Sequence, residues 1–152
     1  MNTVQPHIAI RRAAAGDADT VSSLANQLWP HCKPETLRDE YADLLLSEDC
    51  AVFLAEAGSQ AAAFAQCQLR RDYVEGSGSS PVGYLEAVYV EEPFRRRGIA
   101  KALVQQCEQW AGAKGCWEFA SDCELTNEQS LRFHLGAGFR EANRVICFIK
   151  KL

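Results

Sequence analysis

One carboxylate stands in the middle of an apolar run that leads directly into a basic, glycine-containing turn. The run is Tyr84-Leu-Glu-Ala-Val-Tyr-Val90, the turn is Arg95-Arg-Arg-Gly-Ile-Ala100, and an amphipathic stretch from Lys101 to Ala113 follows. A strand that enters a helix through such a turn presents backbone N–H groups and a helix dipole to phosphate. Glu86, just upstream, could accept a proton from a molecule held beside the phosphates. We therefore expect a phosphate-containing ligand and acid–base chemistry in one short stretch of chain.

Other phosphate-binding motifs have less support. The sequence contains no GxxxxGK[ST], which argues against a P-loop, and Gly76-Ser-Gly78 lacks the third glycine and the following helix of a dinucleotide-binding fingerprint. Arg95-x-x-Gly98-x-Ala100 is short, and alone it can mark a plain helix N-terminus or a solvated basic turn. Its position between an apolar strand and an amphipathic helix favours a bound anion.

Length and composition indicate one ordinary globular domain. The chain has 152 residues, of which 47% are hydrophobic and 24% charged, so we expect residues 1–152 to form one domain with a sizeable core. No apolar run approaches transmembrane length, and residues 1–12 lack the apolar region of a signal peptide. We therefore expect a cytoplasmic protein that does not bind a membrane.

Charge and cysteine usage narrow the possible partners. The net charge of −4 argues against a general nucleic-acid binder. The acidic residues cluster, and several of them lining one cleft would favour a cationic substrate. Seven cysteines are scattered without a CxxC pair, which gives zinc ribbons and thioredoxin chemistry little support. We expect reduced, mostly buried thiols and no metal ion.

A scaffold of strands and helices must position these groups, and hydrophobic patterning predicts its order as β-α-α-β-β-β-α-β-α-β. This order indicates an α/β fold with helices on both sides of a mixed sheet. The Gly- and Ser-rich segment 72–81 is expected to be a loop. The expected strands are 7–13, 51–57, 61–71, 82–90, 116–120 and 139–150; the expected helices are one capped by Asp17 or Asp19 and ending at Trp29, one from Pro34 to Leu45, one over 99–113, and one from Thr126 or Asn127 to Leu135.

Two segments of the chain carry a resemblance to a known family. They are Arg95-x-x-Gly98-x-Ala100 and Asn127-x-x-Ser130-x-x-Phe133-His134-x-x-x-Gly138-Phe139. Together they resemble the acetyl-CoA-binding core of the GCN5-related N-acetyltransferases (GNAT), and the order of elements is similar over essentially the whole chain. Within that family the chain looks most like the aminoglycoside 6′-N-acetyltransferases; this closer likeness is carried by Gln27-Leu-Trp-Pro30, Arg71-Asp-Tyr-Val-Glu-Gly76, Ser79-Ser-Pro-Val82, Leu85-Glu86, Ala120-Ser-Asp122 and 134–139.

The resemblance implies where acetyl-CoA, the expected co-substrate, binds. Backbone amides of Val88, Tyr89 and Val90 would pair with the pantetheine arm as a neighbouring strand does. Asn127 would contact the same arm, and capping of the last helix is compatible with that role. Amides of the basic turn would surround the pyrophosphate, whose charge the helix dipole favours; the turn residues are Arg95, Arg96, Arg97, Gly98, Ile99, Ala100 and Lys101.

The resemblance also implies the reacting groups. Glu86 is the candidate general base for the substrate amine, directly or through water, although it could instead only hold the substrate ammonium or pair with an arginine. His134 stands where many relatives have a tyrosine that protonates the leaving thiolate; it could donate that proton, hydrogen-bond the sulfur, or be satisfied by a carbonyl. The candidate substrate-binding residues are Trp29, His31, Tyr73, Glu86, Asp122 and Asn143, of which Trp29 could be core and Asp122 a helix cap.

The expected reaction is direct transfer of an acetyl group from acetyl-CoA to the 6′-amine of a cationic aminoglycoside, which would confer antibiotic resistance. A strand amide near Val88 would stabilise the oxyanion, and the CoA thiolate would leave toward His134. Two alternatives remain open: a GNAT enzyme for another amine, such as a polyamine, amino sugar or peptide N-terminus, and a non-catalytic protein that binds acyl-CoA or antibiotic. The apolar last strand, with Trp110 and Trp117, is compatible with a homodimer.

Overall fold

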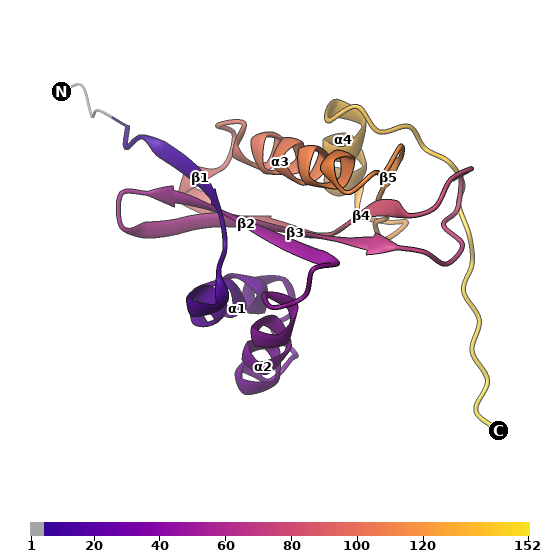
Figure 1. Ribbon diagram of the computed structural model, residues 1–152, viewed down its shortest axis with the longest axis horizontal. Helices are drawn as coiled ribbons and strands as arrows, with labels where there is room; N and C mark the ends of the chain where they lie inside the picture. The colour runs from indigo at the N-terminus through magenta and orange to yellow at the C-terminus, as the bar shows by residue number, and fades with distance from the viewer. Residues whose placement is uncertain (1–4) are drawn as a thin grey trace.

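A mixed β-sheet between two layers of helices is the framework of the protein (Figure 1). The computed structural model describes residues 5–152. Its strands are β1 (Ile8–Arg12), β2 (Cys50–Ala57), β3 (Gln60–Arg70), β4 (Val82–Val90) and β5 (Phe119–Ala120), and its helices are α1 (Ala18–Leu28), α2 (Pro34–Leu44), α3 (Ile99–Ala113) and α4 (Glu128–Gly136). The sheet order is β1-β2-β3-β4-β5, antiparallel except for the parallel pair β4 and β5. The predicted α/β class, with α1 and α2 on one face and α3 and α4 on the other, is confirmed (Figure 1).

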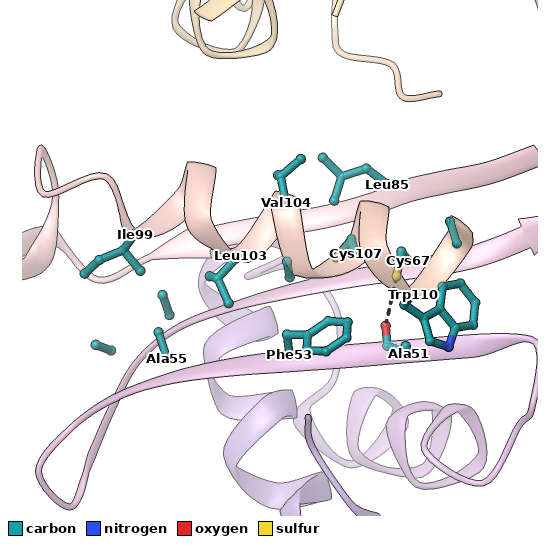
Figure 2. Close-up of a cluster of buried hydrophobic side chains, with 14 of the residues drawn as sticks. Ala51, Phe53, Ala55, Cys67, Leu85, Ile99, Leu103, Val104, Cys107 and Trp110 are labelled. Carbon is teal, nitrogen blue, oxygen red and sulfur yellow. Dashed lines mark hydrogen bonds between the residues drawn. The ribbon is translucent and has the colours of Figure 1, made fainter. Parts of the chain in front are cut away.

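β3 divides two hydrophobic cores because its side chains alternate between the sheet faces. Cys67 packs against α3, where it lies beside Cys107, and Trp110 of the same helix is buried in this cluster (Figure 2). Gln66 faces α1 and α2, and the buried hydroxyl of Tyr41 donates a 2.6 Å hydrogen bond to its amide oxygen. The alternation predicted for this strand is confirmed, and both faces of the sheet are covered at its centre.

The helix ends follow the predicted signals fully in two of three cases. Pro34 begins α2, and the Oδ1 of Asn127 caps α4 by accepting the Ser130 amide at 3.0 Å. For α1, Asp17 occupies the predicted N-cap position, but its side chain makes no capping hydrogen bond to the helix. Its carboxylate instead accepts an upstream amide and binds Arg11 at 2.8 Å.

A β-bulge in β4 sets the position of the central carboxylate. Gln66 of β3 pairs with Ala87 and Cys67 pairs with Leu85, so Glu86 is the extra residue between two paired positions. A bulge bends the strand locally and redirects the side chain at that point. The direction of the Glu86 side chain is therefore set by the bulge, unlike that of the paired residues on either side.

β4 and β5 diverge immediately after the first residues of β4. Their pairing is confined to Gly83 with Phe119 and Tyr84 with Ala120, whereas β4 continues to Val90. β5 is accordingly shorter than the predicted strand over 116–120. From residue 85 to residue 90, β4 therefore has β3 on one edge and no paired strand among residues 5–152 on the other; this unpaired edge is called the opening below.

The predicted last strand over 139–150 is not formed. Residues 139–152, here called the C-terminal arm, run extended away from the sheet (Figure 1). The arm first crosses loop 72–81, where the Asn143 side-chain amide donates to Glu75 at 3.0 Å and Ala142 packs against Gly76. This course carries the arm past the loop rather than along a sheet edge of its own chain. Its apolar side chains are exposed, among them Val145, Ile146, Phe148 and Ile149 at 67–96%.

The burial of the cysteines differs from the prediction. All seven lie in the described part of the chain and are free thiols, but only Cys50, Cys67 and Cys107 are buried, so the expectation of mostly buried thiols is wrong. Among residues 5–152, no helix has both the length and the apolar composition that a bilayer crossing requires.

Candidate active site

Glu86 is held by an arginine that reaches it from the neighbouring strand. The guanidinium of Arg70, at the end of β3, places Nε and Nη2 at 3.0 and 2.8 Å from the Glu86 Oε1, with Nη2 also 3.0 Å from Oε2. The side chains are 36% and 20% exposed, so the pair is accessible from one side. The structure therefore shows the pairing with an arginine that was one of the alternatives for Glu86. Oε2 accepts only one of the three contacts and can still accept a further hydrogen bond.

Tyr84 links this ion pair to Asp122. The Arg70 Cζ lies 3.4 Å from the centre of the buried Tyr84 ring, and the Tyr84 hydroxyl donates a hydrogen bond to the carboxylate of Asp122. Burial first, and this hydrogen bond second, raise the pKa of the Tyr84 hydroxyl above its ordinary value, so Tyr84 remains a neutral donor. The two predicted carboxylates, Glu86 and Asp122, thus belong to one continuous chain of contacts.

Both ring nitrogens of His134 have partners inside the protein. Nδ1 is 2.7 Å from the Ser130 carbonyl oxygen, and Nε2 is 2.8 Å from the Ser121 Oγ. Because a carbonyl only accepts, Nδ1 carries a hydrogen; Nε2 then accepts from the Ser121 hydroxyl when the ring is neutral and donates to its oxygen when the ring is protonated. Ser121 also lies 3.3 Å from the Leu85 carbonyl, at the point where β4 and β5 diverge. A proton that leaves His134 toward this opening would pass through Ser121.

The free edge of β4 presents alternate backbone groups to the opening. The Glu91 amide donates to the Ala62 carbonyl at 2.8 Å, so it faces β3. Since backbone groups alternate along a strand, those of Val88 and Val90 face the opposite edge, and the amide of Tyr89 faces β3. The Arg95 Nε donates to the Val90 carbonyl at 2.8 Å, which agrees with this orientation.

The turn before α3 has the backbone shape of an anion site. Arg96 and Gly98 have φ angles of 62° and 74°, and Gly98 precedes the first turn of the fifteen-residue helix. Left-handed residues in a turn bring successive N–H groups together into a concave nest. A Cβ at Gly98 would meet nothing within 4 Å, so the backbone there is open to a ligand. These features fit the pyrophosphate predicted for the turn.

The side chains of the basic turn are only partly free for that ligand. Arg95 is committed to the β4 backbone, and Arg97 donates to the Gln5 side chain at 2.7 Å. Arg96 and Lys101 are exposed. The backbone amides of the turn, rather than three arginine side chains, are therefore its main anion-binding groups.

Four further predicted substrate residues lie at two other places. The Tyr73 hydroxyl donates to Glu75 at 2.8 Å, and Asn143 donates to the other oxygen of the same carboxylate, which joins the loop to the C-terminal arm. Trp29 follows α1 and borders a cavity of about 260 Å³, which is also lined by Cys32, Leu37, Glu40, Tyr41, Leu44 and Gln66. His31 is exposed in the adjoining turn. Within the described residues, no hydrogen bond or ion pair joins these four residues to Glu86.

Sequence reasoning missed three residues of this site: Arg70, Tyr84 and Ser121. The polar positions 66, 68 and 70 on one face of β3 were a usable signal, because a charged residue at the end of such a face can reach the adjacent strand. Ser121 directly precedes Asp122, but its contact with His134 depends on the tertiary placement of α4.

Among residues 5–152, no group of three or more His, Cys, Asp or Glu side chains is arranged to hold a metal ion.

Comparisons with known proteins agree with this geometry. The family model for the acetyltransferase (GNAT) family matches residues 18–139. An aminoglycoside N(6′)-acetyltransferase type 1 from Serratia marcescens is 42% identical over 135 residues, which cover 88% of this chain and 92% of that protein. A protein of the same name from Salmonella typhimurium is 37% identical over 142 residues, covering 93% and 98%.

Solved structures extend the similarity to the three-dimensional fold. The aminoglycoside N-acetyltransferase AAC(6′)-Iy in complex with CoA superposes with a TM-score of 0.94 at 35% identity and covers all of both chains. AAC(6′)-Iy in complex with the bisubstrate analogue CoA-S-monomethyl-acetylneamine has a TM-score of 0.92 at 36% identity, covering 96% of this chain and 99% of that one. The family match, the close relatives and the shared fold together show that the chain belongs to the acetyltransferase (GNAT) family.

Proposed function

We propose that this chain transfers the acetyl group of acetyl-CoA to the 6′-amine of aminoglycosides and thereby confers resistance to these antibiotics. The observation that carries the proposal is the chain of contacts Glu86–Arg70–Tyr84–Asp122, which places two carboxylates beside the opening between β4 and β5. Carboxylates beside an aromatic ring suit a polycationic substrate. The close similarity to aminoglycoside N(6′)-acetyltransferases supports the same substrate class.

Acetyl-CoA fits the opening and the turn next to it. The amides of Val88 and Val90 face the opening and suit the pantetheine arm, and Asn127, at the start of α4, is the predicted side-chain contact to that arm. The amides of the turn up to Lys101 suit the pyrophosphate. When bound, acetyl-CoA supplies the activated acetyl group as a thioester.

The residues around the acceptor amine have separate roles in proton transfer and substrate binding. Glu86 accepts the proton of the attacking amine, and Asp122 holds an ammonium group of the substrate. In its protonated form His134 can donate its Nε2 proton to the Ser121 oxygen while Ser121 gives its own proton to the leaving thiolate, which leaves a neutral imidazole, a serine hydroxyl and the free thiol. The substrate rings are then bordered by residues from the helix α1 end, loop 72–81 and the C-terminal arm, namely Trp29, His31, Tyr73 and Asn143. No metal ion takes part.

A direct test is thiol release from acetyl-CoA by the purified chain. Tobramycin and kanamycin are expected to give rapid release, whereas spermidine and a panel of peptide N-termini are not. Release only with peptides or polyamines would instead support a GNAT enzyme for another amine. Binding of CoA and tobramycin without any thiol release would support a non-catalytic binding protein and contradict the proposal.

We further propose that residues 1–152 act as a single cytoplasmic domain and form a homodimer through the C-terminal arm. The arm has the alternating apolar composition of a strand, yet Phe148 and Ile149 are 90% and 96% exposed. An extended segment with unpaired backbone is completed most readily by the sheet of a second copy. Trp117, 91% exposed beside β5, suits such a contact, whereas Trp110 belongs to the core of its own chain.

A further inference from the structure

Arg70 is fixed on two sides by groups of β4. Its guanidinium makes three contacts of 2.8–3.0 Å with the Glu86 carboxylate, and its Cζ lies over the Tyr84 ring, 3.4 Å from the ring centre. Tyr84 is itself fixed, because it is buried and its hydroxyl donates to Asp122. The guanidinium is therefore a permanent positive charge held at a defined place beside the proposed base.

The two carboxylates of the site consequently differ in their electrostatic surroundings. Glu86 is paired with a full positive charge, whereas the Asp122 carboxylate accepts a hydrogen bond from a neutral phenol and forms no ion pair among residues 5–152. An ammonium group is attracted more strongly to Asp122 than to the Glu86–Arg70 pair. An uncharged amine, by contrast, can donate to the remaining acceptor capacity of Glu86 Oε2.

This difference matches what acetyl transfer needs. The attacking amine must give up its extra proton before it can act as a nucleophile, while the other ammonium groups of the substrate should remain charged and bound. A positive charge close to an amine disfavours the protonated form of that amine. Arg70 supplies that charge at Glu86 and at the same time holds the carboxylate in one orientation.

Resting on the proposed function, we propose that Arg70 is a positioning residue that favours the uncharged form of the acceptor amine at Glu86 and leaves the substrate's ammonium groups to Asp122. Arginine suits this task better than lysine, because its planar fork binds both carboxylate oxygens and stacks on an aromatic ring. A lysine at the same place would keep the charge and lose the fixed geometry. Charge and geometry can therefore be separated by experiment.

The titratable groups that face the Arg70–Glu86 pair are few among the described residues. They are Tyr84 on β4, Asp122 after β5 and the Cys50 thiol on β2. Burial raises the pKa of both the tyrosine hydroxyl and the thiol, so both stay uncharged at neutral pH. His134 lies behind Ser121, and repeating the comparison in a His134→Gln background removes the imidazole from the pH profile.

The test is the pH dependence of kcat with tobramycin for wild type, Arg70→Met, Arg70→Lys and the control Arg71→Met. Arg71 follows Arg70 but pairs with exposed Asp49, so its substitution removes the same charge outside the site. Removing the Arg70 charge stabilises the protonated form of the acceptor amine. The fall of kcat on the acidic side of the pH profile (the acidic limb) should therefore move to higher pH by about one unit in Arg70→Met. Its plateau should fall about tenfold. Arg70→Lys should keep the wild-type limb but show the same loss at the plateau, and Arg71→Met should match wild type.

An acidic limb of Arg70→Met that coincides with wild type would overturn the proposal, and so would full recovery of the plateau by Arg70→Lys. Stabilisation of each variant by CoA against thermal unfolding checks that it is folded, and Arg70→Gln replaces Arg70→Met if the latter is not. Unfolding of all three Arg70 variants would assign the residue a purely structural role and also contradict the inference. A wild-type chain without tobramycin turnover would instead contradict the proposed function, so the two failures are distinguishable.

Discussion

Ser121 stands between the imidazole of His134 and the backbone of β4. Its hydroxyl oxygen lies 2.8 Å from the His134 Nε2 and 3.3 Å from the Leu85 carbonyl oxygen, at the point where β4 and β5 part. The group in position to protonate a thiolate in the opening is therefore the serine, with the histidine behind it. From the sequence, His134 is the candidate for this role, with hydrogen bonding to the sulfur or to a carbonyl as alternatives, and Ser121 is not identified.

If Ser121 and His134 act as one unit, the effects of their substitutions on the activation free energy will not be additive. Ser121→Ala and His134→Gln are each expected to lower kcat by about tenfold to a hundredfold, and the double variant by no more than the larger single effect. A double-mutant cycle on kcat, measured with tobramycin, provides the check. The exposed Gln129, on α4, supplies the control Gln129→Ala, whereas Ser130 is unsuitable because both its carbonyl and its hydroxyl lie near the His134 Nδ1. Multiplicative losses would show that the two groups act independently.

Glu86→Gln should lower kcat by about a hundredfold to a thousandfold, because an amide of the same shape cannot accept the amine proton. Affinity for CoA should stay within about twofold, since the carboxylate faces the acceptor rather than the turn before α3. The exposed Glu108, on α3, supplies the matched control Glu108→Gln, for which no kinetic change is expected. Full kcat of Glu86→Gln across the pH range would exclude the base role.

Gly98→Ala should weaken CoA binding about tenfold and lower the free energy of unfolding by about 1 kcal/mol, because φ of 74° is strained for a residue with a Cβ. Calorimetric titration with CoA and chemical denaturation measure the two effects. Gly112→Ala is the control, since Gly112 lies inside α3 with open space around it and ordinary helical φ. Unchanged CoA affinity of Gly98→Ala would count against the turn as the pyrophosphate site.

The hydrogen bonds from Arg11 lower the pKa of Asp17 from 3.8 to about 2. A lower pKa in the folded state means that the pair stabilises the protein above about pH 4 and that this stability is lost as the pH falls toward 2. Arg11 is 45% exposed, so the contribution should be on the order of 1 kcal/mol. The gap in free energy of unfolding between wild type and Asp17→Asn should therefore close between pH 4 and pH 2 in urea titrations. Asp19→Asn, which removes a more exposed ion pair with Arg38, should show little gap at any pH, and a constant Asp17→Asn gap would contradict the assignment.

The arm-mediated dimer predicts a change in mass when the arm becomes polar. Phe148→Asp should shift the protein from dimer to monomer in light scattering after size exclusion, because a carboxylate cannot be buried in the partner's sheet without a large cost. Leu46→Asp, at a similarly exposed apolar residue after α2, should leave the dimer intact. A monomeric wild type, or a dimeric Phe148→Asp variant, would contradict the role of the arm.

Local patterning was enough to predict most of the scaffold. The period-two alternation of β3, the proline at the start of α2 and the asparagine cap of α4 each depend on neighbours in sequence, and the structure confirms all three. The side chain of Asp17 does not cap α1 because Arg11, on another element, competes for its carboxylate. The last strand failed because strand formation needs a partner edge, which periodicity does not specify.

In the candidate site, too, features that depend on local sequence could be predicted and those that depend on long-range contacts could not. Glu86, Asp122, His134 and the glycine turn could be found from residue type and spacing together with the family resemblance. Arg70 and Tyr84 could not, because their contact depends on the register of β3 against β4 and on the bulge at Glu86. Long-range register fixes which side chains meet, and the sequence pattern alone leaves that open.

The central claim is that an acetyl group moves from acetyl-CoA to the 6′-amine of an aminoglycoside in the site built around Glu86 and Asp122. The most direct measurement is NMR and mass analysis of tobramycin after incubation with acetyl-CoA and the wild-type chain. One acetyl group on the 6′-nitrogen, formed far more slowly by Glu86→Gln, is the predicted result. An acetyl group on a different amine, or unmodified tobramycin from a chain that binds CoA, would contradict the account.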